Sequence, residues 1–231
     1  LDNIDTEYCK NNNIFVQPAT GMNADSVAEY VINSSLTLLK KTKIVNTQTQ
    51  NGKWPRTTIT TKELRGKTLG LIGFGNISKK VLKLANAFDV STIIYDPFVS
   101  LEETNSYNVR KVSFEEILNL ADVISIHVPL NNETKYIFNN DSFNKMKQKP
   151  IIINSSRGGI INETDLLNAY LNNNISGFAL DVFESEPVNE TFLSKITNEM
   201  NCILTPHNAG VTEESNERVS KFIIKKTNEF L

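Results

Sequence analysis

The stretch that decides the fold reads Gly70-Leu71-Ile72-Gly73-Phe74-Gly75-Asn76-Ile77-Ser78. The apolar residues at its start predict a buried strand, and the residues after it have helical periodicity. Gly73 and Gly75 would allow a tight strand-to-helix turn whose backbone approaches a pyrophosphate, which the helix N-terminus would bind. Two glycines after a strand are by themselves more often just a turn, and Ser78 replaces the third glycine of the dinucleotide-binding motif.

Asp96 strengthens the case for a dinucleotide. It ends the next predicted strand, about 20 residues after Gly75, where a carboxylate can accept hydrogen bonds from an adenosine ribose. A helix cap is the alternative interpretation, but the spacing and the following Pro97 favour the ribose. Because a carboxylate here would repel a 2′-phosphate, we expect NAD rather than NADP.

Short apolar runs alternate with amphipathic stretches from about Lys67 onward. This alternation predicts βαβ units and an α/β fold, with a doubly wound parallel sheet covered by helices on both faces. The expected strands are 68–72, 92–95, 123–126, 151–154, 177–180 and 202–204, and the expected helices include 77–88, 114–120 and a helix capped by Asn162 that runs through 170.

A long helix is expected before the sheet, from Asp25 to about Lys43, with a loop around Trp54 after it. Its apolar residues include Val27 and Val31. A long helix outside a compact α/β unit needs another surface to bury its apolar side. We therefore expect a second copy of the chain to cover it, which would make the protein a homodimer.

The composition argues against several classes of function. The 231 residues carry 24 basic and 26 acidic side chains, a net charge of −2, which disfavours a nucleic-acid or membrane-surface role. No apolar run approaches the ~20 residues of a membrane span, and the polar first residues do not resemble a signal peptide. Cys9 and Cys202 match no metal or redox spacing, so we expect two free thiols in the cytoplasm and no metal site.

Arg157 is a candidate for binding a carboxylate. It lies in Asn154-Ser155-Ser156-Arg157-Gly158-Gly159, at the end of a predicted strand, where ligands of such sheets bind. The planar guanidinium group suits a carboxylate in a bidentate arrangement. A lone arginine in a turn is usually a surface residue, but other candidates also fall at strand ends.

His207 is the candidate proton carrier, since the chain has only two histidines. It follows a strand and Pro206, and Glu186 could hold its imidazole and stabilise the charged form. The other histidine, His127, also ends a strand. We expect it to be structural, lining a cofactor cleft through its backbone.

These segments together resemble the D-isomer-specific 2-hydroxyacid dehydrogenases, and among them 3-phosphoglycerate dehydrogenases and glyoxylate/hydroxypyruvate reductases. The resemblance covers the whole chain. The motifs that carry it, in order, are Asp2-Asn3-Ile4-Asp5, Ser26-Val27-Ala28-Glu29, Gly73-Phe74-Gly75-Asn76-Ile77, His127-Val128-Pro129, Ser156-Arg157-Gly158-Gly159, Asp181-Val182-Phe183-Glu184 and Thr205-Pro206-His207.

The resemblance implies reversible hydride transfer between NAD and C2 of a D-2-hydroxy acid, with 3-phosphoglycerate as one candidate. The family's catalytic arginine, glutamate and histidine fall on Arg157, Glu186 and His207. Its cofactor contacts fall on Gly73, Gly75, Asn76 and Ile77 at the pyrophosphate, Asp96 at the ribose, Val128 in the cleft, and Ser155, Ser156 and Asp181 near the nicotinamide.

The resemblance also implies two domains. Residues 1–22 would be the tail of a flavodoxin-like substrate domain whose remainder is absent, 23–209 the Rossmann NAD-binding domain with its dimer helix, and 210–231 the return to the substrate domain. An NAD-sensing corepressor on the same fold is the alternative function, although no basic or peptide-docking segment supports it. A degenerate, non-catalytic relative is a third possibility, against which the retained triad argues.

Overall fold

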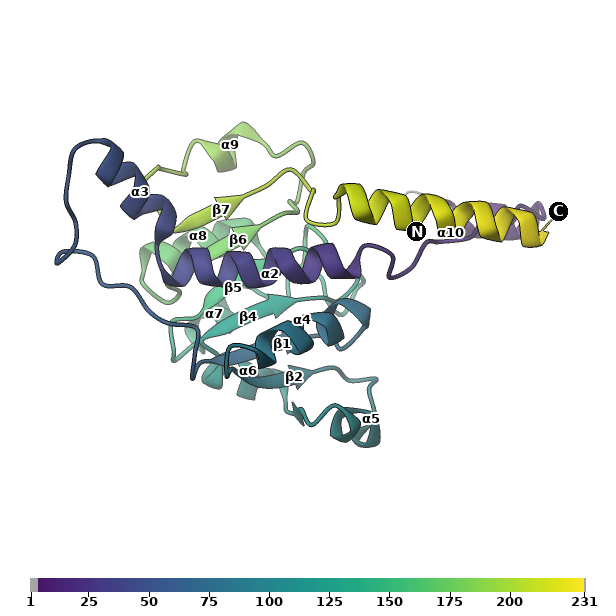
Figure 1. Cartoon of the computed structure of the whole chain (residues 1–231), viewed down its shortest axis with the longest axis horizontal. Helices are drawn as coiled ribbons and strands as arrows, with labels where there is room; N and C mark the ends of the chain where they lie inside the picture. Colours follow the sequence, from purple (N-terminus) through teal and green to yellow (C-terminus); the bar gives the residue numbers. More distant parts are fainter. Residues whose placement is uncertain (1–3, 231) are drawn as a thin grey trace.

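The computed structural model describes residues 4–230, and within this range seven strands form one parallel sheet (Figure 1). Asp2 and Asn3, which begin the first motif above, lie outside the described residues. The strands are β1 (Thr68–Ile72), β2 (Ser91–Tyr95), β3 (Arg110–Lys111), β4 (Val123–Ile126), β5 (Ile151–Asn154), β6 (Gly177–Leu180) and β7 (Cys202–Leu204). Their order, β3-β2-β1-β4-β5-β6-β7, confirms the predicted doubly wound sheet.

The strand order reverses between β1 and β4, which are neighbours in the sheet. At such a point the connections leave the sheet in opposite directions and open a crevice at the carboxyl ends of the strands. The predicted strands have the observed bounds, except that β2 begins one residue earlier, at Ser91. These strands could be predicted because strands that are buried on both faces are continuous apolar runs in the sequence.

The helices that surround the sheet also follow the predicted pattern. The predicted 77–88 helix is observed as α4, the 114–120 helix has the predicted bounds, and Asn162 caps α8 by accepting a 3.0 Å hydrogen bond from the backbone of Asp165. Within the described residues the helices are α1 (Thr6–Asn11), α2 (Ala24–Leu39), α3 (Thr42–Gln50), α4 (Asn76–Asn86), α5 (Leu101–Ser106), α6 (Phe114–Leu120), α7 (Asn140–Asn144), α8 (Glu163–Leu171), α9 (Glu190–Leu193) and α10 (Glu213–Phe230).

The long helix expected over 25–43 differs from the prediction in two ways. It ends at Leu39, because Lys41 has a left-handed backbone (φ 50°) that starts the separate helix α3. Its apolar side is also covered by its own chain: Val27, Val31 and Leu38 are buried where α2 packs on α4 and on β5, β6 and β7. Contrary to the prediction, this side of α2 needs no second copy of the chain to bury it.

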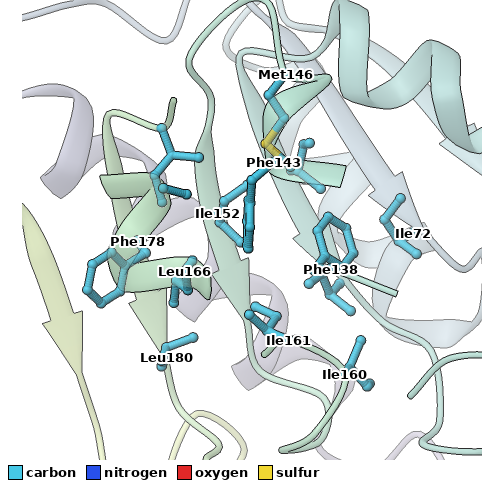
Figure 2. Packing of buried hydrophobic residues seen from close by; sticks show 14 of the residues in the cluster. Ile72, Phe138, Phe143, Met146, Ile152, Ile160, Ile161, Leu166, Phe178 and Leu180 are labelled. Carbon is cyan, nitrogen blue, oxygen red and sulfur yellow. The ribbon is translucent and has the colours of Figure 1, made fainter. Parts of the chain in front are cut away.

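The sheet divides the hydrophobic core into two layers, because successive side chains of a strand point to opposite faces. On β5, Ile152 belongs to the layer under α6, α7 and α8, while Ile151 and Ile153 belong to the layer under α2 and α4. Figure 2 shows the first layer, where Ile152 packs among Phe138, Phe143 and other aromatic and aliphatic side chains.

The two ends of the described chain extend from the same side of the sheet (Figure 1). Ser26 of α2 hydrogen-bonds Thr212 before α10 (Oγ to Oγ1, 2.8 Å), and the Arg218 side chain donates to the Met22 carbonyl at 2.8 Å. The segments that connect the two ends of the chain to the sheet are therefore held together by these hydrogen bonds. Among the described residues, no helix is both long and apolar enough to span a membrane.

Candidate active site

The glycine turn after β1 has the shape that a pyrophosphate requires. Gly73 has φ +90°, and a Cβ on it would lie 2.8 Å from the His127 carbonyl oxygen, so no other residue fits. Gly75 precedes α4, and nothing lies within 4 Å of a Cβ built there, so its open side faces the cleft. Ser78 is fully buried and donates to the Gly73 carbonyl oxygen at 2.6 Å. The serine is therefore accommodated where the motif usually has glycine.

Asp96 follows β2 and lines the same cleft as the glycine turn. Its Oδ2 accepts a 2.8 Å hydrogen bond from the Phe74 backbone, and its Oδ1 accepts one of 2.8 Å from Phe98. The cap of the next helix is Ser100, whose side chain accepts from the Glu103 backbone, so Asp96 is not that cap. The cleft has a volume of about 560 Å³, and Pro97 and Phe98 also line it.

A second cavity, of about 490 Å³, continues from the first across the ends of β4, β5 and β6. The two share the 127–129 segment of the chain. The second cavity is lined by Ser155, Ser156 and Asp181, which the resemblance places near the nicotinamide, and also by Val128 and by Ile77, which it places in the cleft and at the pyrophosphate. The Oγ of Ser155 is buried and has no hydrogen-bond partner among the described residues. An elongated two-part ligand with polar groups, such as a dinucleotide, fits this pair of cavities.

The loop that carries Arg157 is held by Asn154, a residue that the sequence analysis did not single out. Asn154 is 1% exposed; its Oδ1 accepts from the Ser156 backbone and hydroxyl, and its Nδ2 donates to the Arg157 carbonyl at 2.9 Å. A polar residue at the last position of a buried strand is the signal that would have found it. The side chain of Arg157 itself is exposed at the second cavity.

Glu186 and His207 are in direct contact, as predicted. The Nδ1 of His207 lies 2.7 Å from the Oε2 of Glu186, whose Oε1 accepts a 3.1 Å hydrogen bond from the Phe183 backbone. Burial raises the pKa of Glu186, but these hydrogen bonds and the charges of His207 and Arg157 outweigh it and hold that pKa below its ordinary value. Arg157, Glu186 and His207 line a third cavity, of about 860 Å³.

Asp181 holds the loop on which His207 lies. Its Oδ1 accepts hydrogen bonds from the Thr205 hydroxyl (2.6 Å) and the Asn208 backbone (2.9 Å), and its Oδ2 accepts from the Ala209 backbone (2.8 Å). His207 has φ 55°, a region that costs energy for residues other than glycine. Asp181 lines the second cavity, but its three hydrogen bonds join parts of its own chain.

His127 is unsuited to carrying a proton near neutral pH. Its Nε2 lies 2.9 Å from the Ser125 hydroxyl, and its buried Nδ1 has no hydrogen-bond partner among residues 4–230. Burial lowers the pKa of His127 to about 3, so the ring is neutral above that pH. In the same range of residues, no group of three or more His, Cys, Asp or Glu side chains could hold a metal ion.

Comparisons with known proteins agree on one family. Residues 32–209 match the model of the D-isomer specific 2-hydroxyacid dehydrogenase, NAD binding domain. The chain is 38% identical to (S)-sulfolactate dehydrogenase of Chromohalobacter salexigens, over 95% of this chain and 71% of that protein. It is 34% identical to D-3-phosphoglycerate dehydrogenase of Bacillus subtilis, over the whole chain but 43% of that protein.

A solved structure gives the same result. The D-lactate dehydrogenase of Aquifex aeolicus, complexed with NAD and lactic acid, is 31% identical and superposes with a TM-score of 0.89, over all of this chain and 73% of that one. These similar proteins are named as dehydrogenases, which favours an oxidoreductase over a corepressor.

Proposed function

The chain belongs to the D-isomer specific 2-hydroxyacid dehydrogenase family and is an NAD-dependent oxidoreductase, and from this premise we propose which residues perform the reaction and on what substrate. The substrate is a D-2-hydroxy acid or the corresponding 2-keto acid. The compounds in the names of the similar proteins, which include sulfolactate, phosphoglycerate and lactate, all contain a 2-hydroxy acid and differ in the group attached to it. 3-Phosphoglycerate is our first candidate among these.

The cofactor would be held along the two connected cavities. Gly73, Gly75, Asn76 and Ile77 would bind the pyrophosphate, at the turn and the helix N-terminus. Asp96 would bind the adenosine ribose and repel a 2′-phosphate, which favours NAD over NADP. The residues proposed for the nicotinamide end are Val128, Ser155, Ser156 and Asp181. When bound, NAD supplies or accepts the hydride.

The observation that carries the mechanism is the 2.7 Å contact between Glu186 and His207, in a cavity that Arg157 also lines. Because Glu186 occupies Nδ1 of His207, the other ring nitrogen, Nε2, is the atom that would take the hydroxyl proton in oxidation and return it in reduction. Arg157 would bind the substrate carboxylate and polarise the 2-keto oxygen. Glu186 would orient the imidazole and stabilise its charged form.

The domain boundaries follow from the same premise. We assign residues 23–209 to the cofactor domain, and 1–22 and 210–231 to parts of a second domain. The shared side on which α1 and α10 lie, and the Arg218–Met22 hydrogen bond, support this division (Figure 1). The free Cys9 and Cys202 suit the cytoplasm.

We also propose a homodimer in which the loop after α3, and not α2, contacts the second copy. Trp54 on this loop is 79% exposed, and a cavity of about 780 Å³ lies between the 58–62 segment and the body, lined in part by Leu38, Ile44 and Leu171. A second copy would cover these apolar groups. Light scattering of the intact protein at micromolar concentration tests this, and a monomer would contradict it.

The function is tested by NADH oxidation with a panel of 2-keto acids: pyruvate, glyoxylate, hydroxypyruvate, 3-phosphohydroxypyruvate and 3-sulfopyruvate. We expect turnover with at least one of them and weaker binding of NADPH than of NADH in a fluorescence titration. Tight NADH binding without turnover of any acid would contradict the proposed reaction. Equal binding of both cofactors would contradict the role of Asp96.

A further inference from the structure

Two glutamates that the proposed mechanism does not use bind each other's backbone. Glu163 is the first residue of α8, and Glu184 lies in the turn after β6. The Glu163 backbone N–H donates to the Oε1 of Glu184 at 2.9 Å, and the Glu184 N–H donates to the Oε1 of Glu163 at 2.7 Å. This reciprocal pair joins the segment after Arg157 to the turn that contains Glu186.

A carboxylate in the position of Glu163 is costly for the folded protein. The residue is 7% exposed, and burial together with the nearby charge of Glu184 raises its pKa. Buried carboxylates are rare unless they are paired or hydrogen-bonded. At Glu163 the compensating hydrogen bond comes from the Glu184 backbone.

The bond from Glu184 to Glu163 fixes one particular peptide unit, between Phe183 and Glu184. Gly158, next to Arg157, presses against the carbonyl side of this unit: a Cβ on it would lie 1.7 Å from the Phe183 carbonyl oxygen. The preceding N–H, that of Phe183, donates to Glu186. This N–H belongs to the preceding peptide unit, whereas Glu186 follows Glu184 by two residues. The position of the Glu186 carboxylate relative to the Phe183 N–H therefore depends on how the Phe183–Glu184 unit is held.

Tyr136 adds a third segment to the same contact. Its hydroxyl donates to the Oε2 of Glu184 at 3.1 Å, and its backbone N–H donates to the Gly159 carbonyl at 2.8 Å. Tyr136 has φ 51°, which is unfavourable for a large side chain, so its neighbours must hold it there. The loops after β4, β5 and β6 therefore meet at Glu184.

We propose that Glu163, acting through the Glu184 backbone, is a positioning residue for Glu186 and hence for His207. This inference rests on the proposed function, in which Glu186 orients the imidazole. When Glu163 is lost, the Phe183–Glu184 unit can turn, the chain that carries Glu186 moves with it, and the hydrogen bond from the Phe183 N–H to the Glu186 carboxylate weakens. That bond contributes to the lowered pKa of Glu186, so its loss moves this pKa upward.

The test compares Glu163→Ala, Glu163→Asp and Glu163→Gln in the intact protein. Alanine removes the acceptor, aspartate keeps the charge but is one methylene too short, and glutamine keeps an acceptor oxygen of the same reach. The matched control is Asp165→Ala in the same turn of α8, because Asp165 accepts from the Asn140 backbone and not from the Glu186 turn. His207 and Arg157, the charged groups that act on Glu186, are present in every variant.

Two readouts separate positioning from simple stability. The first is the ¹³C NMR titration of the Glu186 carboxyl. We expect its midpoint at higher pH in Glu163→Ala and Glu163→Asp, and unchanged in Glu163→Gln and Asp165→Ala. The second is keto-acid reduction, for which we expect kcat to fall roughly tenfold to a hundredfold in Glu163→Ala and Glu163→Asp, the range seen for residues that orient metal ligands. The acid limb of the pH profile should move to higher pH, because Glu186 is then protonated earlier as pH falls.

An unchanged Glu186 midpoint in Glu163→Ala would overturn the proposal, as would the same shift in Asp165→Ala or a glutamine variant that behaves like alanine. If the alanine variant does not fold, the aspartate variant carries the test. The titration needs no substrate. If the wild type reduces no keto acid, the proposed function fails while the positioning role is still decided by the titration.

Discussion

His127 makes the stability of this protein depend on pH in a way that can be isolated. Its pKa in the fold is about 3, against 6.5 for an ordinary histidine. Below pH 6.5 His127 therefore binds a proton in the unfolded chain but stays neutral in the folded chain. Proton binding by the unfolded chain lowers the free energy of unfolding, which is unaffected by His127 above pH 6.5 and falls as pH decreases from 6.5 towards 3. One proton changes the free energy of unfolding by at most about 1.4 kcal/mol per pH unit, or about 3 kcal/mol between pH 6.5 and 4.5.

Part of His127 faces the cofactor cleft, where water screens charge, so we expect about 1–3 kcal/mol of this change. The assay is urea unfolding at pH 7.0 and 4.5, without NAD, of the wild type and His127→Gln. Since the chain has only two histidines, His207→Gln is the matched control. The wild type and the control should lose about 1–3 kcal/mol more than His127→Gln between the two pH values. Parallel losses in all three proteins would refute the lowered pKa of His127 and return it to the candidates for proton transfer.

Further predictions concern the site. His207→Gln should lower kcat for keto-acid reduction by roughly 10²–10⁴-fold while NADH binding stays unchanged, and near-normal turnover would remove His207 from the mechanism. Glu186→Gln should retain activity but move its pH optimum to lower pH, because the imidazole loses the carboxylate that favours its charged form; a pH–rate profile in the same position as the wild type would contradict this. Gly158→Ala should cost about 1–3 kcal/mol in urea unfolding, because its Cβ would meet the Phe183 carbonyl. Gly75→Ala should leave stability nearly unchanged, since nothing lies within 4 Å of its Cβ, yet weaken NADH binding measured by fluorescence; equal stability losses in the two alanine variants would contradict the geometry.

Most of the sheet could be predicted from the sequence because its central strands are apolar on both faces. The edge strand β3, Arg110–Lys111, could not, since it has two charged residues and pairs with β2 alone. The helix α5 was missed for a similar reason: it is short, and Thr104 is its only buried residue. The cover of α2 could not be foreseen because it comes from α4 and from β5, β6 and β7, which are distant in the sequence and meet α2 only in the folded chain.

The candidate site was foreseen where a residue type and a strand end coincide, as at Arg157 and His207. Glu163 was not predicted, because it accepts from a backbone N–H of a loop that follows another strand, and no complementary side chain in the sequence indicates this contact. Asn154 binds residues two and three positions further along, and only its polar side chain at the end of an apolar strand indicates its role. Asp181 shows the same limit, since its hydrogen bonds to the His207 loop depend on the approach of β6 to β7.

The serine at position 78 shows that the three positions of the glycine-rich motif have different structural requirements. The first position, Gly73, needs backbone freedom, and the second, Gly75, needs empty space for a ligand. The third needs only a small residue, and at Ser78 the extra atom finds a partner in the turn itself. A search that requires three glycines would pass over chains of this kind, whereas one that allows glycine, alanine or serine at the last position would retain them without weakening the other two.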